Sequence, residues 1–192
     1  MTGEEILVVM LVVMVTMLGG VLLYARHYKR VPPNRAMVVY GLRRPGSPIG
    51  FSVITAGGRY IMPIRETVAW MSLNVHTLEL TFDDVGSDVR NHGPRLRIQL
   101  VAQARISGDG DRLLVAAQNL LGKPDEEIQR IARLAVESHL RAVCASLSAQ
   151  EVGANRDAVA EQVRERAEKD LEKIGMELPS LVLREVSARR EG

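Results

Sequence analysis

Residues 6–25 have the sequence ILVVMLVVMVTMLGGVLLYA and contain no charged side chain. Twelve of them are Leu, Ile or Val, and three are Met. A helix of this length measures about 30 Å, which matches the hydrocarbon thickness of a bilayer. At about −0.3 to −0.6 kcal/mol for each Leu, Ile or Val, the stretch favours membrane insertion by about 4 to 7 kcal/mol. The sequence therefore predicts a membrane anchor, whose main residues are Ile6, Leu7, Leu11, Leu18, Leu22 and Leu23.

The flanks of this stretch predict an anchor that is retained and not cleaved. A signal peptide has a basic N-terminal region and a small-residue cleavage site, whereas residues 1–5 are acidic and no such site follows the apolar run. Residues 26–44 contain six Lys or Arg and no acidic residue. Because basic residues beside a span stay in the cytoplasm, we expect a cell-membrane protein with a cytoplasmic folded part. A single span and a re-entrant hairpin bent at Gly19–Gly20 both fit this orientation.

The basic flank has a second interpretation. Each Lys or Arg near an anionic leaflet contributes about 1 kcal/mol of binding, so the same residues that set topology can select anionic lipids. Both interpretations stay open at this point. The candidate residues are Arg26, Lys29, Arg30 and Arg35.

The rest of the composition narrows the class of protein. About 160 residues follow the anchor, which is enough for one domain or two small ones. The net charge is only +2, aromatic residues make up 4% of the chain, and no basic stripe is interleaved with aromatics, so we expect no nucleic-acid partner. The single cysteine, Cys144, excludes an intrachain disulfide, and its apolar neighbours predict a buried small side chain.

Between residues 35 and 106 the hydrophobic pattern has a period near two, which predicts strands. The strictest alternation lies at residues 95–106, where basic and amide side chains alternate with Leu, Ile and Ala. Such a strand has one wet and one buried face, and we expect it at or near the centre of a sheet. A hairpin is predicted over residues 51–62 with its turn at Gly57–Gly58. Further strands are predicted at 36–40, 67–73 and 75–82.

Between residues 111 and 175 the period changes to that of helices. The first helix is predicted over 112–121, with Asp111 as its N-cap. A second begins at Pro124, and Ser148 with Glu151 has the spacing of a capping box. A last helix begins at Asn155 or Arg156 and ends before Gly175, and a strand at 178–186 is predicted to pair with an edge of the first sheet.

This order of elements predicts an α+β fold, with a transmembrane or hairpin helix followed by a mixed, mostly antiparallel sheet, amphipathic helices and a C-terminal strand. We expect three parts: an anchor with its basic flank at 1–30, one folded domain at 31–187 and a tail at 188–192.

No set of side chains predicts catalysis. The four histidines lack metal-ligand spacing, no glycine-rich loop has the Lys and Ser/Thr of a phosphate-binding loop, and no nucleophile elbow is present. We therefore expect no catalytic residue, no cofactor and no metal, and a chain that is not an enzyme. His139 is predicted to form a hydrogen bond within a helix pair.

Five segments resemble the flotillin branch of the stomatin/prohibitin/flotillin/HflK-C (SPFH, band 7) superfamily, over about residues 5–187. Residues 31–39 are similar to the segment that follows the membrane anchor in that branch, and residues 53–64 to its glycine hairpin leading into a proline. Glu137-Ser138-His139-Leu140-Arg141 resembles an acidic-small-His-Leu-Arg motif. Residues 148–151 and 170–176 resemble the following helices and a D-L-x-K-x-G turn.

The resemblance implies an SPFH-like domain and a non-catalytic membrane scaffold that forms homo-oligomers and organises membrane microdomains. A regulatory subunit that binds or encloses another membrane protein, such as a protease or channel, is the alternative, and an anchored hydrolase with an unrecognised site is a third hypothesis. Flotillins continue into a long coiled coil that this sequence lacks after residue 188. A truncated form and a natural short form both fit, and both put assembly of a large cage in doubt.

Overall fold

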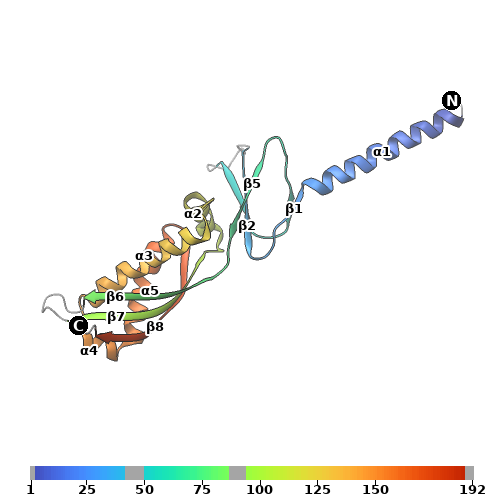
Figure 1. Ribbon diagram of the computed structural model, residues 1–192. Coiled ribbons are helices and arrows are strands. Elements are labelled where there is room, and N and C mark those ends of the chain that lie inside the picture. The colour runs from blue at the N-terminus through green and yellow to red at the C-terminus, as the bar shows by residue number, and fades with distance from the viewer. Residues whose placement is uncertain (1–2, 42–49, 87–93, 189–192) are drawn as a thin grey trace. The chain divides into compact units, whose positions relative to one another are not determined.

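The computed structural model describes residues 3–41, 50–86 and 94–188. The chain divides into two compact units, an N-terminal unit at Met1–Trp70 and a C-terminal unit at Met71–Gly192. In the N-terminal unit, helix α1 (Gly3–His27) runs without interruption through Gly19 and Gly20 and continues directly into strand β1 (Tyr28–Arg30) (Figure 1). The predicted apolar N-terminal helix is therefore confirmed.

The strands of the N-terminal unit form two small sheets. β2 (Arg35–Tyr40) lies between β3 (Phe51–Ile54) and β5 (Thr67–Ser72), and β1 pairs with β4 (Gly58–Tyr60). Four consecutive residues of the central strand β2, from Ala36 to Val39, are buried. Both faces of β2 are therefore covered, which explains why its sequence is a continuous apolar run. A small core here consists of Met37, Val39 and Ile61, with Val31, Ile54 and Val68 packed against it.

The predicted hairpin over residues 51–62 is wrong in its pairing. β3 pairs antiparallel with β2, whereas β4 pairs antiparallel with β1, placing Tyr28 opposite Tyr60. The turn itself is present, and Gly57 has a φ of +83°, which favours glycine. The glycine signal thus predicts where the chain turns, but the turn joins strands of two different sheets.

The C-terminal unit is built on an antiparallel sheet in the order β6 (His76–Gly86), β7 (Arg95–Ile106), β8 (Met176–Ala188). The predicted central position of β7 is confirmed. Its apolar residues are at most 2% exposed: Leu96, Ile98, Leu100, Ala102, Ala104 and Ile106. The opposite face is polar, and ion pairs cross it, with Arg97 Nε 3.2 Å from Asp83 Oδ1 and Arg105 paired with Glu177.

Helices cover the apolar face of this sheet. They are α2 (Gly110–Leu120), α3 (Asp125–Cys144), α4 (Ala149–Ala154) and α5 (Arg156–Glu172). The longest two, α3 and α5, run along the sheet and pack against each other, with α3 over β6 and α5 over β8 (Figure 1). Each buries one stripe, which for α3 consists of Ile128, Ala132, Val136, Leu140, Val143 and Cys144.

The helix N-termini follow the sequence prediction in one case and not in another. The capping box is confirmed, because the Glu151 N–H donates to Ser148 Oγ at 3.2 Å and the Ser148 N–H donates to Glu151 Oε2 at 2.8 Å. The predicted Asp111 cap is wrong, because α2 begins earlier and Asp109 occupies the N-cap position. The Asp109 N–H donates to Ser107 Oγ at 3.3 Å, and this local turn brings the start of the helix forward.

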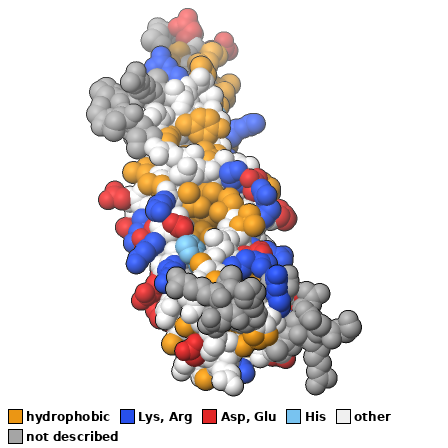
Figure 2. Space-filling view, turned by 90° about the vertical axis from the view of Figure 1, so that its left-hand side faces the viewer, with side chains coloured by type: hydrophobic (Ala, Val, Ile, Leu, Met, Phe, Trp, Pro, Cys, Tyr) orange, Lys and Arg blue, Asp and Glu red, His pale blue; other side chains and the backbone are white. Residues whose placement is uncertain are grey.

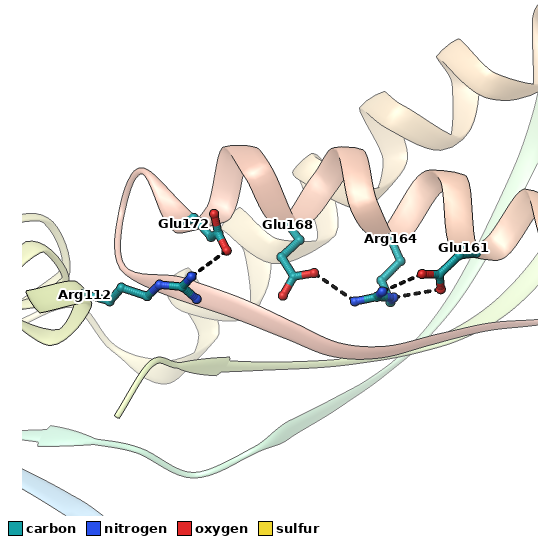
Figure 3. Close-up of polar contacts among 5 residues, drawn as sticks. All are labelled: Arg112, Glu161, Arg164, Glu168 and Glu172. Carbon is teal, nitrogen blue, oxygen red and sulfur yellow. Dashed lines mark hydrogen bonds and ion pairs between the residues drawn. The ribbon is translucent and has the colours of Figure 1, made fainter. Parts of the chain in front are cut away.

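Gly175 lies where α2, the end of β7 and the turn from α5 into β8 meet. Its φ is +82°, and a Cβ built on it would lie 2.4 Å from the Ala116 N and 2.5 Å from the Arg112 O. The Ser107 N–H donates to its carbonyl at 3.0 Å, and Arg112 pairs with Glu172 at 2.9 Å (Figure 3). The backbone of α2 therefore leaves no room for a side chain at position 175.

We expect Gly175→Ala to lower the free energy of unfolding by about 2 to 5 kcal/mol, combining left-handed strain with overpacking. Gly122→Ala is the matched control, because Gly122 has the same φ of +82° with no atom within 4 Å of an added Cβ. It should cost only the strain, about 1 to 2 kcal/mol. Urea unfolding of the detergent-solubilised chain, followed by far-UV circular dichroism, measures both values. Equal losses for the two variants would contradict the close packing.

Candidate membrane-attachment site

Helix α1 exposes apolar side chains around its whole circumference. None of its residues is buried, and the six predicted anchor residues are 47–67% exposed. With 25 residues and a mean hydropathy of 2.9 in its most apolar window, the helix is long and apolar enough to cross a membrane. A helix that is apolar on all sides needs an apolar environment, which for this helix no other part of the described chain supplies.

Polar groups inside α1 are satisfied by its own backbone. The Thr16 hydroxyl donates to the Val12 carbonyl at 2.7 Å. At the C-terminal end, His27 Nδ1 lies 2.8 Å from the Leu23 carbonyl, and because a carbonyl only accepts, the ring nitrogen donates. Each of these side chains therefore bonds to a carbonyl four residues earlier in the same helix. Both contacts lower the cost of placing these groups in hydrocarbon.

Charges at the two ends of α1 match its dipole. Glu4 and Glu5 lie in the first turn, and Arg26 and His27 lie in the last. Negative groups near the N-terminus and positive groups near the C-terminus each stabilise a helix by about 0.3 to 1 kcal/mol. The same arrangement leaves the middle of the helix free of charge.

Three tyrosines form a stacked cluster where α1 ends. The Tyr24 ring lies 5.5 Å from the Tyr60 ring at an angle of 10°, and 5.9 Å from the Tyr28 ring at 26°, measured between ring centroids. His27 lies against the same Tyr60 ring at 6.1 Å. Tyrosine is enriched where a membrane meets water, because its ring is apolar and its hydroxyl is polar. A tyrosine cluster at the end of an apolar helix is therefore the arrangement expected where a membrane meets water.

Backbone hydrogen bonds fasten α1 to the sheet below this cluster. The Ile61 N–H donates to the His27 carbonyl at 3.1 Å, and the Val31 N–H donates to the Gly57 carbonyl at 2.9 Å. A Cβ at Gly58 would lie 2.6 Å from the Tyr28 hydroxyl oxygen, so the ring occupies the space that glycine leaves open. The anchor thus joins the folded unit without a flexible linker.

The four predicted headgroup residues surround the same junction. Arg26, Lys29, Arg30 and Arg35 are all exposed, and within the described residues no carboxylate forms an ion pair with any of them. Arg59 differs, because it is largely buried and pairs with Glu66. The remaining two basic residues of the flank, Arg43 and Arg44, lie outside the described residues. Contact of the four with lipid headgroups stays a prediction.

Charges in the C-terminal unit are mostly used within the chain. On α5, Arg164 lies between two carboxylates, 2.5 Å from Glu161 Oε1 and 2.8 Å from Glu168 Oε2 (Figure 3). The guanidinium lowers the pKa of Glu161 below its ordinary value. Basic and acidic side chains lie side by side over the face seen in Figure 2. Glu161 is exposed, and Arg164 and Glu168 are half-buried at the surface, so these pairs are screened by solvent and suit a solvated surface.

The two sequence motifs in the helices contact each other. His139 Nε2 lies 2.8 Å from Asp170 Oδ2, which confirms the predicted bond within a helix pair, and Lys173 Nζ lies 2.7 Å from Asp170 Oδ1. Hydrogen bonds from Lys173 and His139 hold the pKa of Asp170 below its ordinary value. Asp170 therefore links α3 to the end of α5, which is a structural role.

The cysteine is equally structural. Cys144 is fully buried at the end of α3, as predicted, and burial raises the pKa of its thiol to about 11. A thiol with this pKa is protonated at neutral pH, so it is a poor nucleophile. Across residues 3–41, 50–86 and 94–188, no cluster of three or more His, Cys, Asp or Glu could hold a metal ion.

Comparison with known proteins identifies the class. Residues 29–191 match the SPFH domain / Band 7 family, so the chain belongs to that family. Over 156 residues it is 35% identical to flotillin-1 of Homo sapiens, covering 80% of this chain and 35% of that relative, and over 155 residues it is 34% identical to flotillin-1 of Carassius auratus. It is a flotillin-type member that spans about a third of the length of these curated relatives.

Membership supports a membrane-associated, scaffold-type role, and proteins of this family are non-enzymatic, which agrees with the expectation that the chain is not an enzyme. The family match begins at residue 29, so α1 precedes the matched segment. The domain boundaries expected from the sequence stay a prediction.

Several residues of the attachment site were missed by the sequence analysis. Tyr24 was counted only as part of the apolar run, and Tyr60 was assigned to a hairpin with β3. The cluster becomes visible only once β4 is known to pair with β1, because that pairing places Tyr60 opposite Tyr28. A tyrosine one turn before the basic flank was the available signal.

Proposed function

We propose that this chain is a membrane scaffold: α1 spans the cell membrane, the folded units lie on its cytoplasmic side, and copies of the chain assemble to organise a membrane microdomain. The observation that carries the proposal is the all-round apolar α1, none of whose residues is buried, joined without a linker to a domain of the SPFH / band 7 family. Membership in a non-enzymatic family supports a role in organisation and not in catalysis.

A single span is favoured over a re-entrant hairpin. The helix continues through Gly19 and Gly20, and its 25 residues measure about 37 Å, more than the hydrocarbon thickness. The basic residues that flank the apolar stretch lie at and after its C-terminal end, from Arg26 onward, and Lys and Arg beside a span remain in the cytoplasm.

Features of the C-terminal unit support self-association. Within the described residues, β6 and β8 form the two edges of its sheet, and edges pair readily with another chain. Leu134 on α3 and Val182 on β8 are 54% and 49% exposed, which makes both available to a neighbouring copy.

Charge placed inside α1 should release the chain from membranes. Each Arg near the bilayer centre costs about 2.5 to 3.5 kcal/mol, so Val12→Arg with Val15→Arg should cancel the favourable insertion energy of about 4 to 7 kcal/mol. Flotation in a sucrose gradient after carbonate treatment should leave this variant at the bottom. The control Val12→Leu with Val15→Leu should float. Equal flotation of both variants would contradict anchoring by α1.

Accessibility of introduced cysteines should report the orientation. In a Cys144→Ala background, we expect a membrane-impermeant maleimide to label Thr2→Cys in intact cells and to label Ala142→Cys, which is exposed on α3, only after permeabilisation. Protection of both positions would support the hairpin. Labelling of Ala142→Cys in intact cells would overturn the cytoplasmic placement of the folded units.

Single-molecule photobleaching in supported bilayers should reveal assembly. We expect the fluorescently labelled full chain to bleach in several steps at low surface density, because copies associate through the C-terminal unit. Single-step bleaching at every density would contradict self-association. Stoichiometric co-purification of a membrane protease or channel with a monomeric chain would favour the regulatory-subunit alternative.

A further inference from the structure

The turn after β4 carries exposed apolar side chains that are not part of a hydrophobic core. Ile64 is 93% exposed, more than any large hydrophobic side chain of α1, where the highest value is 72% at Met17. Met62 is 48% exposed, and Pro63 between them is also exposed. Large apolar side chains at such exposure suggest a contact that forms in the cell.

The strand pairing places this turn beside the end of α1 (Figure 1). β1 leads away from α1, and β4 runs antiparallel to β1, so the chain approaches α1 as it leaves Tyr60. The Ile61 N–H donates a hydrogen bond of 3.1 Å to the His27 carbonyl, which holds the start of the turn next to the C-terminal end of α1. The turn at 62–64 therefore begins level with the last turn of α1.

Its own hydrogen bonds hold the turn in shape. The N–H groups of Arg65 and Glu66 donate to the Met62 carbonyl at 3.1 and 2.9 Å. The Met62 N–H donates to Glu66 Oε2 at 3.2 Å, while Glu66 Oε1 pairs with Arg59. The two charged side chains are 17% and 11% exposed, so the base of the turn is fixed. A preformed turn loses little entropy when its tip binds.

The charges around the tip suit a lipid surface. Arg65 is exposed directly after Ile64, Arg26 is exposed in the last turn of α1, and the one carboxylate of the turn, Glu66, is neutralised by Arg59. Within the described residues neither Arg65 nor Arg26 forms an ion pair, and an apolar tip flanked by such basic side chains is the arrangement that lies in the boundary between headgroups and acyl chains. The contact would be continuous with that of α1.

We propose that the turn Met62–Ile64 inserts into the same leaflet from which α1 emerges and gives the N-terminal unit a second contact with the bilayer. The proposal rests on the membrane anchoring of α1 proposed above. A single tilted helix fixes where the unit lies but not which side of the unit faces the bilayer. A second contact beside the helix axis selects one side.

Fluorescence quenching tests this in the full chain. In a Cys144→Ala background, the environment-sensitive dye NBD is attached at Ile64→Cys, at Leu18→Cys inside α1, or at Ala56→Cys, and the chain is reconstituted into vesicles of phosphatidylcholine and phosphatidylglycerol. Ala56 is the matched control, because it is exposed in the same unit but precedes β4, at the end far from α1. Aqueous iodide and lipids that carry doxyl groups at shallow or deep positions serve as quenchers.

We expect the dye at position 64 to lose most of its accessibility to iodide and to be quenched best by shallow doxyl groups, at a depth of about 5 to 10 Å. Position 18 should respond to deep groups, and position 56 to iodide alone. Iodide accessibility at 64 equal to that at 56, with 18 quenched by lipid, would overturn this inference and leave the anchor intact. Protection at 64 without quenching by lipid would mean that protein covers the turn and would also overturn it. Absence of lipid quenching at 18 would overturn the anchor and this inference together.

Discussion

The hydrogen bond from the Ile61 N–H to the His27 carbonyl joins the two most different environments of this chain. On one side lies a helix that is apolar on all sides between its charged ends, and on the other lies a sheet with its own small core. Because β1 follows α1 directly and pairs with β4, the backbone passes from one environment to the other within a few residues. The tyrosine cluster, the basic flank and the apolar turn all take their positions from this junction.

Charges serve different purposes in the two units. In the C-terminal unit many charged side chains form ion pairs with one another: Arg164 lies between two carboxylates, and Asp170 accepts hydrogen bonds from both His139 and Lys173. The motifs that resemble flotillins therefore stabilise the packing of α3 on α5, and Gly175 of the same segment allows close contact with α2. Around the end of α1, by contrast, exposed basic side chains are left available for contacts outside the chain.

Patterns that act over short distances were predictable from the sequence. The apolar run of α1, the alternation of β7 and the capping box at Ser148 each depend on neighbouring residues, and each was found as expected. Pairing between strands depends on residues far apart, so Gly57–Gly58 indicated a turn but not its partner strands. The tyrosine cluster depends on that pairing and was missed for the same reason. The N-cap of α2 was displaced by a hydrogen bond at Ser107 that periodicity does not reveal.

The absence of a linker between α1 and β1 has a mechanical consequence. A helix longer than the local hydrocarbon thickness tilts to bury its apolar length, and biological membranes differ in thickness by a few Å. Any change in the tilt of α1 turns β1 as well, because its backbone is continuous with the helix, and turns β4, which is hydrogen-bonded to β1 and to the end of α1. With α1 spanning the bilayer as proposed, the inclination of the β1–β4 sheet against the membrane plane would therefore follow the bilayer thickness, transmitted by the main chain alone.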